Sequence, residues 1–236
     1  MSFKEFAIHP QQAISFKLMK QIDYHAIKNY DLPIELMMEN AGYHLAKLCA
    51  ASVRQTDKIL IGVGKGHNGG GGLVAARRLL AWGYRVYIDV LEEMLSDLTA
   101  QQFNRAVAFG AMVKTIDNPD LVVDAYFGFS QRLPLPEVYI IRIKQLNRSK
   151  APIISLDVPT GLPENPEENH PFIQADTVVS LAYPKKVLFN RNLNAKILLV
   201  DIGIPAVAFE DFGISYPFPF DADGILQLKV NQLIAD

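Results

Sequence analysis

Residues 61–73 read IGVGKGHNGGGGL and hold seven of the 15 glycines of this 236-residue chain. An apolar run, DKILIGVG, leads into the stretch, and LVAARRLLAWG follows it. The β-branched run predicts a buried strand, and the apolar spacing after the glycines predicts a helix. The stretch is therefore expected to be a strand-to-helix turn, the repeating unit of α/β folds with a parallel sheet.

The same alternation of strand-like and helix-like segments continues along the chain. The spacing predicts helices at 16–27, 34–53, 71–83, 96–109 and 135–149, and strands at 58–64, 84–91, 112–116, 120–127, 151–158, 176–183 and 196–203. Several strands are apolar throughout, as expected when helices cover both faces of a parallel sheet. Without an internal repeat or a linker-like change of composition, one domain over residues 1–236 is expected.

Composition excludes several classes of protein. The net charge of −2 gives no reason to expect nucleic acid or an acidic membrane as a partner, and no apolar segment reaches the length of a membrane span. The single Cys49 fits a reducing compartment and is expected to fill a small buried space. The first residues resemble neither a secretory signal nor a transit peptide, so a cytoplasmic protein is expected.

Polar residues follow four of the predicted strands directly. They are the glycine-rich stretch itself, Asp124, Asp157 with Thr160, and Lys185 with Lys186. Ligands of a doubly wound sheet bind beyond the carboxyl ends of its strands, so these four clusters are expected to meet at one edge. This expected convergence is the main argument for a site.

Each cluster also has a reading without a ligand. Gly64 to Gly69 matches G-x-G-x-x-G, which suits a phosphate at a helix N-terminus but also occurs in plain turns. Asp89 ends the next strand, where dinucleotide folds place a ribose-binding acid. Asp124 and Asp157 suit a cation or acid–base chemistry, or serve only as turn-forming residues. His67 is a proton shuttle or a loop hydrogen-bonding residue.

Other chemistry is disfavoured by what the sequence lacks. The remaining histidines are not spaced as metal ligands, and the chain has one cysteine. Both observations argue against a zinc site. The chain contains no G-x-S-x-G elbow or similar nucleophile arrangement, which disfavours covalent catalysis.

Six motifs, taken in order, resemble the YjeF N-terminal domain family of NAD(P)H-hydrate epimerases, which includes proteins like the apolipoprotein A-I binding protein. These motifs are LMMENAG, GKGHNGGGGLVAARRL, LVVDAYFGFS, SLDVPTGL, LAYPKKVL and VDIGIP. The resemblance covers about residues 16–205 and leaves 206–236 as a C-terminal extension whose role the sequence does not reveal. It implies a three-layer α/β/α Rossmann-like fold with a mostly parallel sheet, often in a homodimer.

The implied activity is interconversion of the R and S epimers of hydrated NADH and NADPH (NADHX and NADPHX), an isomerase reaction in cofactor repair. The partner enzyme is a separate dehydratase that acts on one epimer. The resemblance implies a potassium ion held by Asn68, Asp124 and Thr160, and Asp157 as the catalytic residue. It implies hydrate binding by His67, Asn68, Gly69, Gly70, Gly71, Gly128, Phe129, Ser130, Gln131, Arg132, Leu133, Pro134, Asp157 and Lys185.

Two positions depart from the family's NNGGD, which reads HNGGG here. His67 replaces an Asn and Gly71 replaces the Asp. One alternative is therefore a diverged binding or dimerisation module with another nucleotide-like ligand, because some family members serve as scaffolds. A second alternative is an NAD-dependent oxidoreductase, resting on the glycine motif and Asp89 alone.

Overall fold

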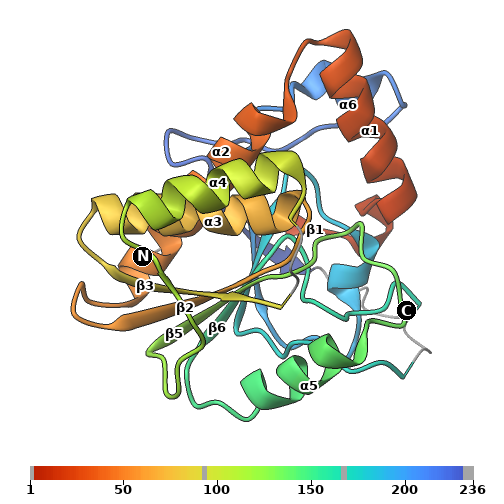
Figure 1. Cartoon of the computed structure of the whole chain (residues 1–236). Coiled ribbons are helices and arrows are strands. Elements are labelled where there is room, and N and C mark those ends of the chain that lie inside the picture. The colour runs from red at the N-terminus through yellow and green to blue at the C-terminus, as the bar shows by residue number, and fades with distance from the viewer. Residues whose placement is uncertain (1–2, 92–94, 166–168, 231–236) are drawn as a thin grey trace.

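The computed structural model describes residues 3–91, 95–165 and 169–230. In these residues one sheet has the order β1-β9-β8-β7-β6-β5-β2-β3-β4. Figure 1 labels β1, β2, β3, β5 and β6 of this sheet. The strands are β1 (Lys4–Ile8), β2 (Lys58–Val63), β3 (Arg85–Val90), β4 (Met112–Val113), β5 (Leu121–Ala125), β6 (Ile153–Leu156), β7 (Thr177–Leu181), β8 (Lys196–Val200) and β9 (Ile225–Val230). Neighbouring strands are parallel except β8 and β9.

Helices cover both faces of this sheet. The helices are α1 (Phe16–Asn29), α2 (Ile34–Ser52), α3 (His67–Ala81), α4 (Asp97–Ala108), α5 (Glu137–Leu146) and α6 (Ala206–Glu210), with short 3₁₀ turns η1 (Pro10–Gln12) and η2 (Lys186–Phe189). Figure 1 shows α2, α3 and α4 on one face, α5 on the other, and α1 beside α6 at the edge. The predicted α/β fold class with a mostly parallel sheet is confirmed.

The core lies where the sequence is apolar throughout. Every residue of β5 and β6 is buried, because helices or loops cover both sides of these central strands. Cys49 of α2 is fully buried, and burial raises the pKa of its thiol to about 12, so it fills space as predicted. Among the described residues, no helix combines the length and apolar character needed to cross a membrane.

The two chain ends extend the sheet beyond the sequence prediction, which placed the last strand at 196–203. That part of the prediction is wrong, because β9 runs antiparallel to β8 and β1 pairs in parallel with β9, with Lys4 opposite Leu226. The segment 206–236, expected as an extension, contains α6 and β9, and its residues 231–236 lie outside the described residues. Both ends are therefore part of the sheet layer.

Candidate active site

The four polar clusters follow β2, β5, β6 and β7, which are adjacent in the sheet. The next two strands of the chain, β3 and β4, lie on one side of β2, and β5 to β8 lie on its other side. The order of strands therefore reverses beside β2. Such a switch point opens a crevice beyond the carboxyl ends of the strands. The predicted convergence is confirmed by contacts that join all four clusters, described below.

Asp157, directly after β6, holds the centre of the site. Its backbone adopts the left-handed conformation (φ +68°), which is uncommon for a residue other than glycine and is concentrated at functional positions. The side chain is 2% exposed and accepts hydrogen bonds from Lys185 Nζ at 2.6 Å and from the N–H of Phe129 at 2.8 Å. The carboxylate is thus fixed by a charged donor and a backbone donor from two different loops.

Lys185 reaches Asp157 from the end of β7. The chain turns sharply at Ala182 (φ +61°). A β-bridge between Ile14 and Lys185 then holds this segment beside the N-terminal part of the chain. The Lys185 ammonium is 1% exposed, also donates to the carbonyl of Leu181 at 2.6 Å, and lies 5.7 Å from the centre of the Phe129 ring. A buried ion pair of this kind is retained only where its remaining hydrogen-bonding groups are also satisfied.

Asp124 lies on β5, the neighbour of β6, and accepts hydrogen bonds from neutral donors. Its fully buried carboxylate accepts hydrogen bonds from Ser155 Oγ at 2.7 Å, the N–H of Thr160 at 2.8 Å and Thr160 Oγ1 at 2.5 Å. Burial is the largest influence and raises the pKa of Asp124, while these hydrogen bonds lower it. Thr160 Oγ1 also accepts from the N–H of Phe127 at 3.1 Å, which ties the β5 and β6 loops together.

Helix α3 begins at His67, four residues earlier than predicted, so the four glycines form its first turns rather than a loop. A methyl group on Gly69 would lie 2.0 Å from the carbonyl oxygen of Gly64, and one on Gly64 would lie 1.9 Å from that of Tyr126. Close packing therefore requires glycine here and overrides its low helix propensity. The helix N-terminus, with its unpaired N–H groups, lies directly on the strand ends.

His67 and Asn68 are the polar residues of this helix start. Asn68 donates from Nδ2 to the carbonyl of Leu156 at 3.3 Å, just before Asp157. The His67 residue is exposed to solvent. Its ring is still partly desolvated by the surrounding protein, and this lowers the pKa of His67. The neutral ring is thus favoured near pH 7 and offers both a donor and an acceptor.

The segment 128–134, predicted to bind the substrate, contacts the Asp157 carboxylate through Gly128 and Phe129. A methyl group on Gly128 would lie 2.8 Å from Asp157 Oδ2 and 3.1 Å from Asn68 Oδ1, so only glycine fits between them. Gln131 donates to the carbonyl of Leu162 at 3.1 Å and accepts from the N–H of Gly161 at 2.7 Å. Of the other predicted residues, Leu133 is half-buried, and Ser130, Arg132 and Pro134 are exposed.

A cavity of about 470 Å³ adjoins this segment. Its lining residues are Phe16, Gln131, Leu133, Leu162, Glu164 and Asn165. Another hollow of about 300 Å³ lies at the start of β6, beside Ile153 and Asp176, at the opposite edge of the sheet. Only the first is near the polar cluster, so it is the better candidate for ligand binding.

Gly71, the position at which the resemblance led us to expect Asp, is a helix residue rather than a loop residue. It lies inside α3, is buried, and a methyl group on it would lie 2.9 Å from Leu156 Cδ2. Gly71 therefore allows α3 to pack closely against Leu156 of β6.

Asp89 is not available as a ribose-binding acid. Its carboxylate is 4% exposed and accepts from Tyr126 Oη at 2.5 Å and Thr115 Oγ1 at 2.7 Å, and it pairs with Arg142 Nε at 2.9 Å. Burial and the neighbouring Asp89 charge raise the pKa of the Tyr126 hydroxyl well above its usual value. The network joins β3, β5 and α5, and it removes the main support for the oxidoreductase alternative.

Two residues near the site were missed by the sequence analysis. Ser155 is the polar member of the buried strand β6, and Asp23 lies on the apolar face of α1 among Met19, Ile22 and Ala26. A polar residue inside an apolar pattern is the signal that could have found both.

The fold and the cluster define the class of the protein: a Rossmann-like α/β domain with a buried acid–lysine pair at its topological switch point. The model of the family described as YjeF-related protein N-terminus matches residues 34–187, and the chain belongs to this family.

Relatives of the chain carry consistent descriptions. NAD(P)H-hydrate epimerase of Anopheles darlingi is 34% identical over 89% of this chain and 93% of its own, and that of Dehalogenimonas lykanthroporepellens is 32% identical over 93% and 94%. The bifunctional NAD(P)H-hydrate repair enzyme Nnr of Thermofilum pendens is 28% identical over 82% of this chain and 40% of its own. The crystal structure of yeast ynu0, YNL200c, superposes with a TM-score of 0.80 at 26% identity, over 92% of this chain and 99% of that one.

Proposed function

We propose that this protein is an NAD(P)H-hydrate epimerase that interconverts the R and S epimers of NADHX and NADPHX. The observation that carries the proposal is the buried Asp157–Lys185 pair at the strand ends, in a chain aligned over almost its whole length with relatives named for this activity. The activity is an isomerase reaction at a single carbon, and the pair supplies the proton transfers that it needs.

The chemistry at that carbon requires one acid step and one base step. The substrate carries a hydroxyl on the carbon beside the ring nitrogen. When the nitrogen lone pair expels the hydroxyl, an acid supplies the proton that makes it water, and a planar iminium-like centre remains. Water then adds to the other face and returns a proton to the site, so no proton is gained or lost overall.

Asp157 passes the proton in both steps of this proposal: its carboxylate relays a proton from the Lys185 ammonium to the departing hydroxyl, and it returns the proton of the added water to Lys185. Its rigid, left-handed backbone and its bond from the Phe129 N–H hold the carboxyl at a fixed position, and general acid–base groups depend on such positioning. Lys185 keeps the carboxyl oriented and carries a proton 2.6 Å away from it. Buried surroundings exclude bulk water and strengthen the interaction of the carboxylate with a developing positive charge.

Substrate binding is assigned to two segments beside Asp157, residues 67–71 and 128–134. The N-terminus of α3, from His67 to Gly71, presents backbone N–H groups that suit the pyrophosphate of the dinucleotide. The segment 128–134 and the adjoining 470 Å³ cavity supply the walls for the reacting half of the molecule.

A potassium ion is proposed as the cofactor of the site. Asn68 Oδ1, the Asp124 carboxylate and Thr160 Oγ1 would hold it, and hard cations prefer such oxygen ligands. The support is that Asp124 is buried with neutral donors only, so its charge lacks a cationic partner among these contacts. The ion would supply positive charge that offsets the carboxylate and the substrate phosphates. A melting temperature raised more by KCl than by equal NaCl, and not in Thr160→Val, tests this.

The remaining proposals concern partners. A dehydratase that acts on one epimer completes the repair, and the name of one relative, a bifunctional NAD(P)H-hydrate repair enzyme, supports this second activity. A homodimer is supported by exposed apolar side chains on α2 and α4, including Leu36, Tyr43 and Val107. Light scattering during size-exclusion chromatography measures the mass and decides between monomer and dimer.

The assay of the activity uses a mixture of hydrated NADH epimers and a dehydratase specific for S. The dehydratase alone quickly converts the S form in the mixture, and the return of NADH absorbance then slows. Added protein is expected to remove the slow phase, because the R form is converted to S. An unchanged slow phase at micromolar protein rejects the proposed function.

A further inference from the structure

Helix α1 carries a half-buried acid, Asp23, that the proposed mechanism does not use. Asp23 follows Met19 by one turn on the inward face of α1, where Met19, Ile22 and Ala26 are 0 or 1% exposed. Its Oδ1 atom is buried and has no hydrogen-bond partner within the part of the chain that the structure describes. Buried polar atoms without partners are rare, and they call for a functional or structural explanation.

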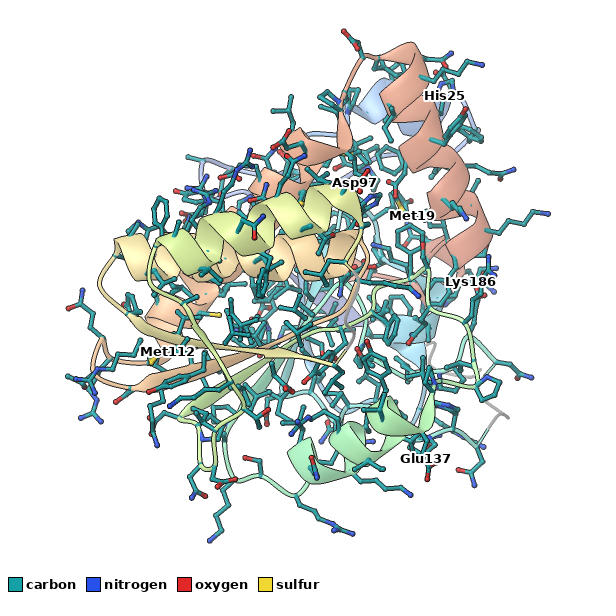
Figure 2. The ribbon with its side chains drawn as sticks, viewed as in Figure 1. Met19, His25, Asp97, Met112, Glu137 and Lys186 are labelled. Atoms are coloured by element: carbon teal, nitrogen blue, oxygen red, sulfur yellow. The ribbon has the colours of Figure 1, made fainter. Side chains whose placement is uncertain are left out.

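Helix α1 is fixed beside the Lys185–Asp157 pair. Just before the helix, the N–H of Ile14 donates to the carbonyl of Pro184 at 3.1 Å, and the N–H of Lys186 donates to the carbonyl of Ile14 at 2.9 Å. The first ring of the helix, Phe16, lies 6.1 Å from the ring of Phe129. In Figure 2, Met19 lies on the side of α1 that faces the molecule, and Lys186 lies at the nearby η2 turn. The start of α1 thus borders the site.

The charges of the pair act on the Asp23 carboxyl. Burial is the largest influence and raises the pKa of Asp23 to about 7, the positive charge of Lys185 lowers it, and the negative charge of Asp157 raises it. The carboxyl therefore changes its charge near neutral pH. Asp23, Asp157 and Lys185 then form a group of two carboxyls and one ammonium whose total charge depends on the proton of Asp23.

Other charged groups near α1 are occupied elsewhere or point outward. At the start of the helix, the N–H of Phe16 donates to Glu164 Oε1 at 3.0 Å, and at its end His25 and Tyr30 contact Asp211 Oδ2 at 2.7 and 2.6 Å. The lysines of the helix, Lys17, Lys20 and Lys28, are exposed. The groups that act on Asp23 are therefore Lys185 and Asp157.

We propose that Asp23 is a positioning residue of the active site, whose carboxyl sets the charge around the Lys185–Asp157 pair and so limits the pH range of the reaction. With its proton, Asp23 leaves Lys185 paired with Asp157 alone. Without it, the second carboxylate competes for the ammonium and disfavours the release of a proton toward the departing hydroxyl. The inference rests on the proposed function for its effect on rate, but the coupling of charges is independent of it.

The first test compares the pH dependence of kcat in the wild type, Asp23→Asn and Asp23→Glu. In the wild type kcat is expected to fall above about pH 7, and in Asp23→Asn that fall moves up by at least one pH unit, because the amide stays neutral. Asp23→Glu restores a fall near neutrality. Asp211→Asn is the matched control, since Asp211 also contacts α1 but outside the site, and it keeps the wild-type profile. Equal profiles for the wild type and Asp23→Asn overturn the proposal.

The second test needs no activity. In protein labelled with ¹³C at the aspartate carboxyls, one NMR signal is expected to titrate near pH 7 and to be missing in Asp23→Asn. Lys185→Met should raise its midpoint and Asp157→Asn should lower it, each by more than half a pH unit. Midpoints unchanged in both variants overturn the proposal even if the enzyme is active. A coupled titration in a protein without epimerase activity upholds the coupling and rejects only the proposed function.

Discussion

Removal of the Lys185 charge tests the central feature of the site, the buried ion pair. Lys185 and Asp157 are 1% and 2% exposed and their charged atoms lie 2.6 Å apart. Lys185→Met leaves the Asp157 carboxylate buried with the Phe129 N–H as its remaining donor among those described. Breaking a buried pair in this way costs about 3–5 kcal/mol. The exposed neighbour provides the control, because Lys186→Met should change the stability by less than about 0.5 kcal/mol.

A double-mutant cycle separates the pair from its surroundings. The free energy of unfolding is measured by urea denaturation for Lys185→Met, Asp157→Asn and the double variant at pH 7. The double variant buries no charge from the pair, so its loss should be smaller than the sum of the single losses by at least about 2 kcal/mol. Additive losses, or a Lys185→Met protein within about 1 kcal/mol of the wild type, would refute the reasoning.

Three further predictions concern residues around the site. Gly69→Ala should cost about 3 kcal/mol or more because its methyl group would lie 2.0 Å from the Gly64 carbonyl, whereas Gly66→Ala, with open space, should cost about 1 kcal/mol or less in urea denaturation. Asp89→Asn should lower the stability by about 1–3 kcal/mol and leave KM unchanged, since Asp89 bonds to the protein; a KM raised tenfold would contradict this. Burial lowers the pKa of His44, so the stability it contributes is present above its usual pKa of 6.5 and is lost as the pH falls below it; melting curves from pH 8 to 5 should show this loss in the wild type and a smaller loss in His44→Gln.

The central sheet could be predicted from the sequence because its strands are local, apolar and separated by helices. The two added strands could not, since β1 and β9 are short and pair across more than 200 residues, with Lys4 opposite Leu226. Nothing in KEFAI or ILQLKV alone indicates that partner. The start of α3 was placed too late for a different reason: four glycines disfavour a helix locally, and contact with the strand ends, seen at Gly64 and Gly69, overrides that preference.

The meeting of Asn68, Asp124, Asp157 and Lys185 could be predicted because parallel strands end at one edge. The structural role of Asp89 could not be predicted from the sequence. Its partners Tyr126, just after β5, and Arg142, in α5, are brought to it only when the chain folds. The sequence also gives no sign that Lys185 would pair with Asp157 rather than face solvent. Roles that depend on such side-chain contacts require the structure.

The epimerase activity of the Asp157→Asn variant is the measurement that tests the account most directly. The variant keeps an oxygen that can accept from Lys185 and loses the acid–base carboxyl. With hydrated NADH epimers and the S-specific dehydratase, the wild type should convert the R form, whereas Asp157→Asn should be slower by at least a hundredfold while its circular dichroism and melting remain those of a folded protein. A folded Asp157→Asn protein with wild-type activity would contradict the account.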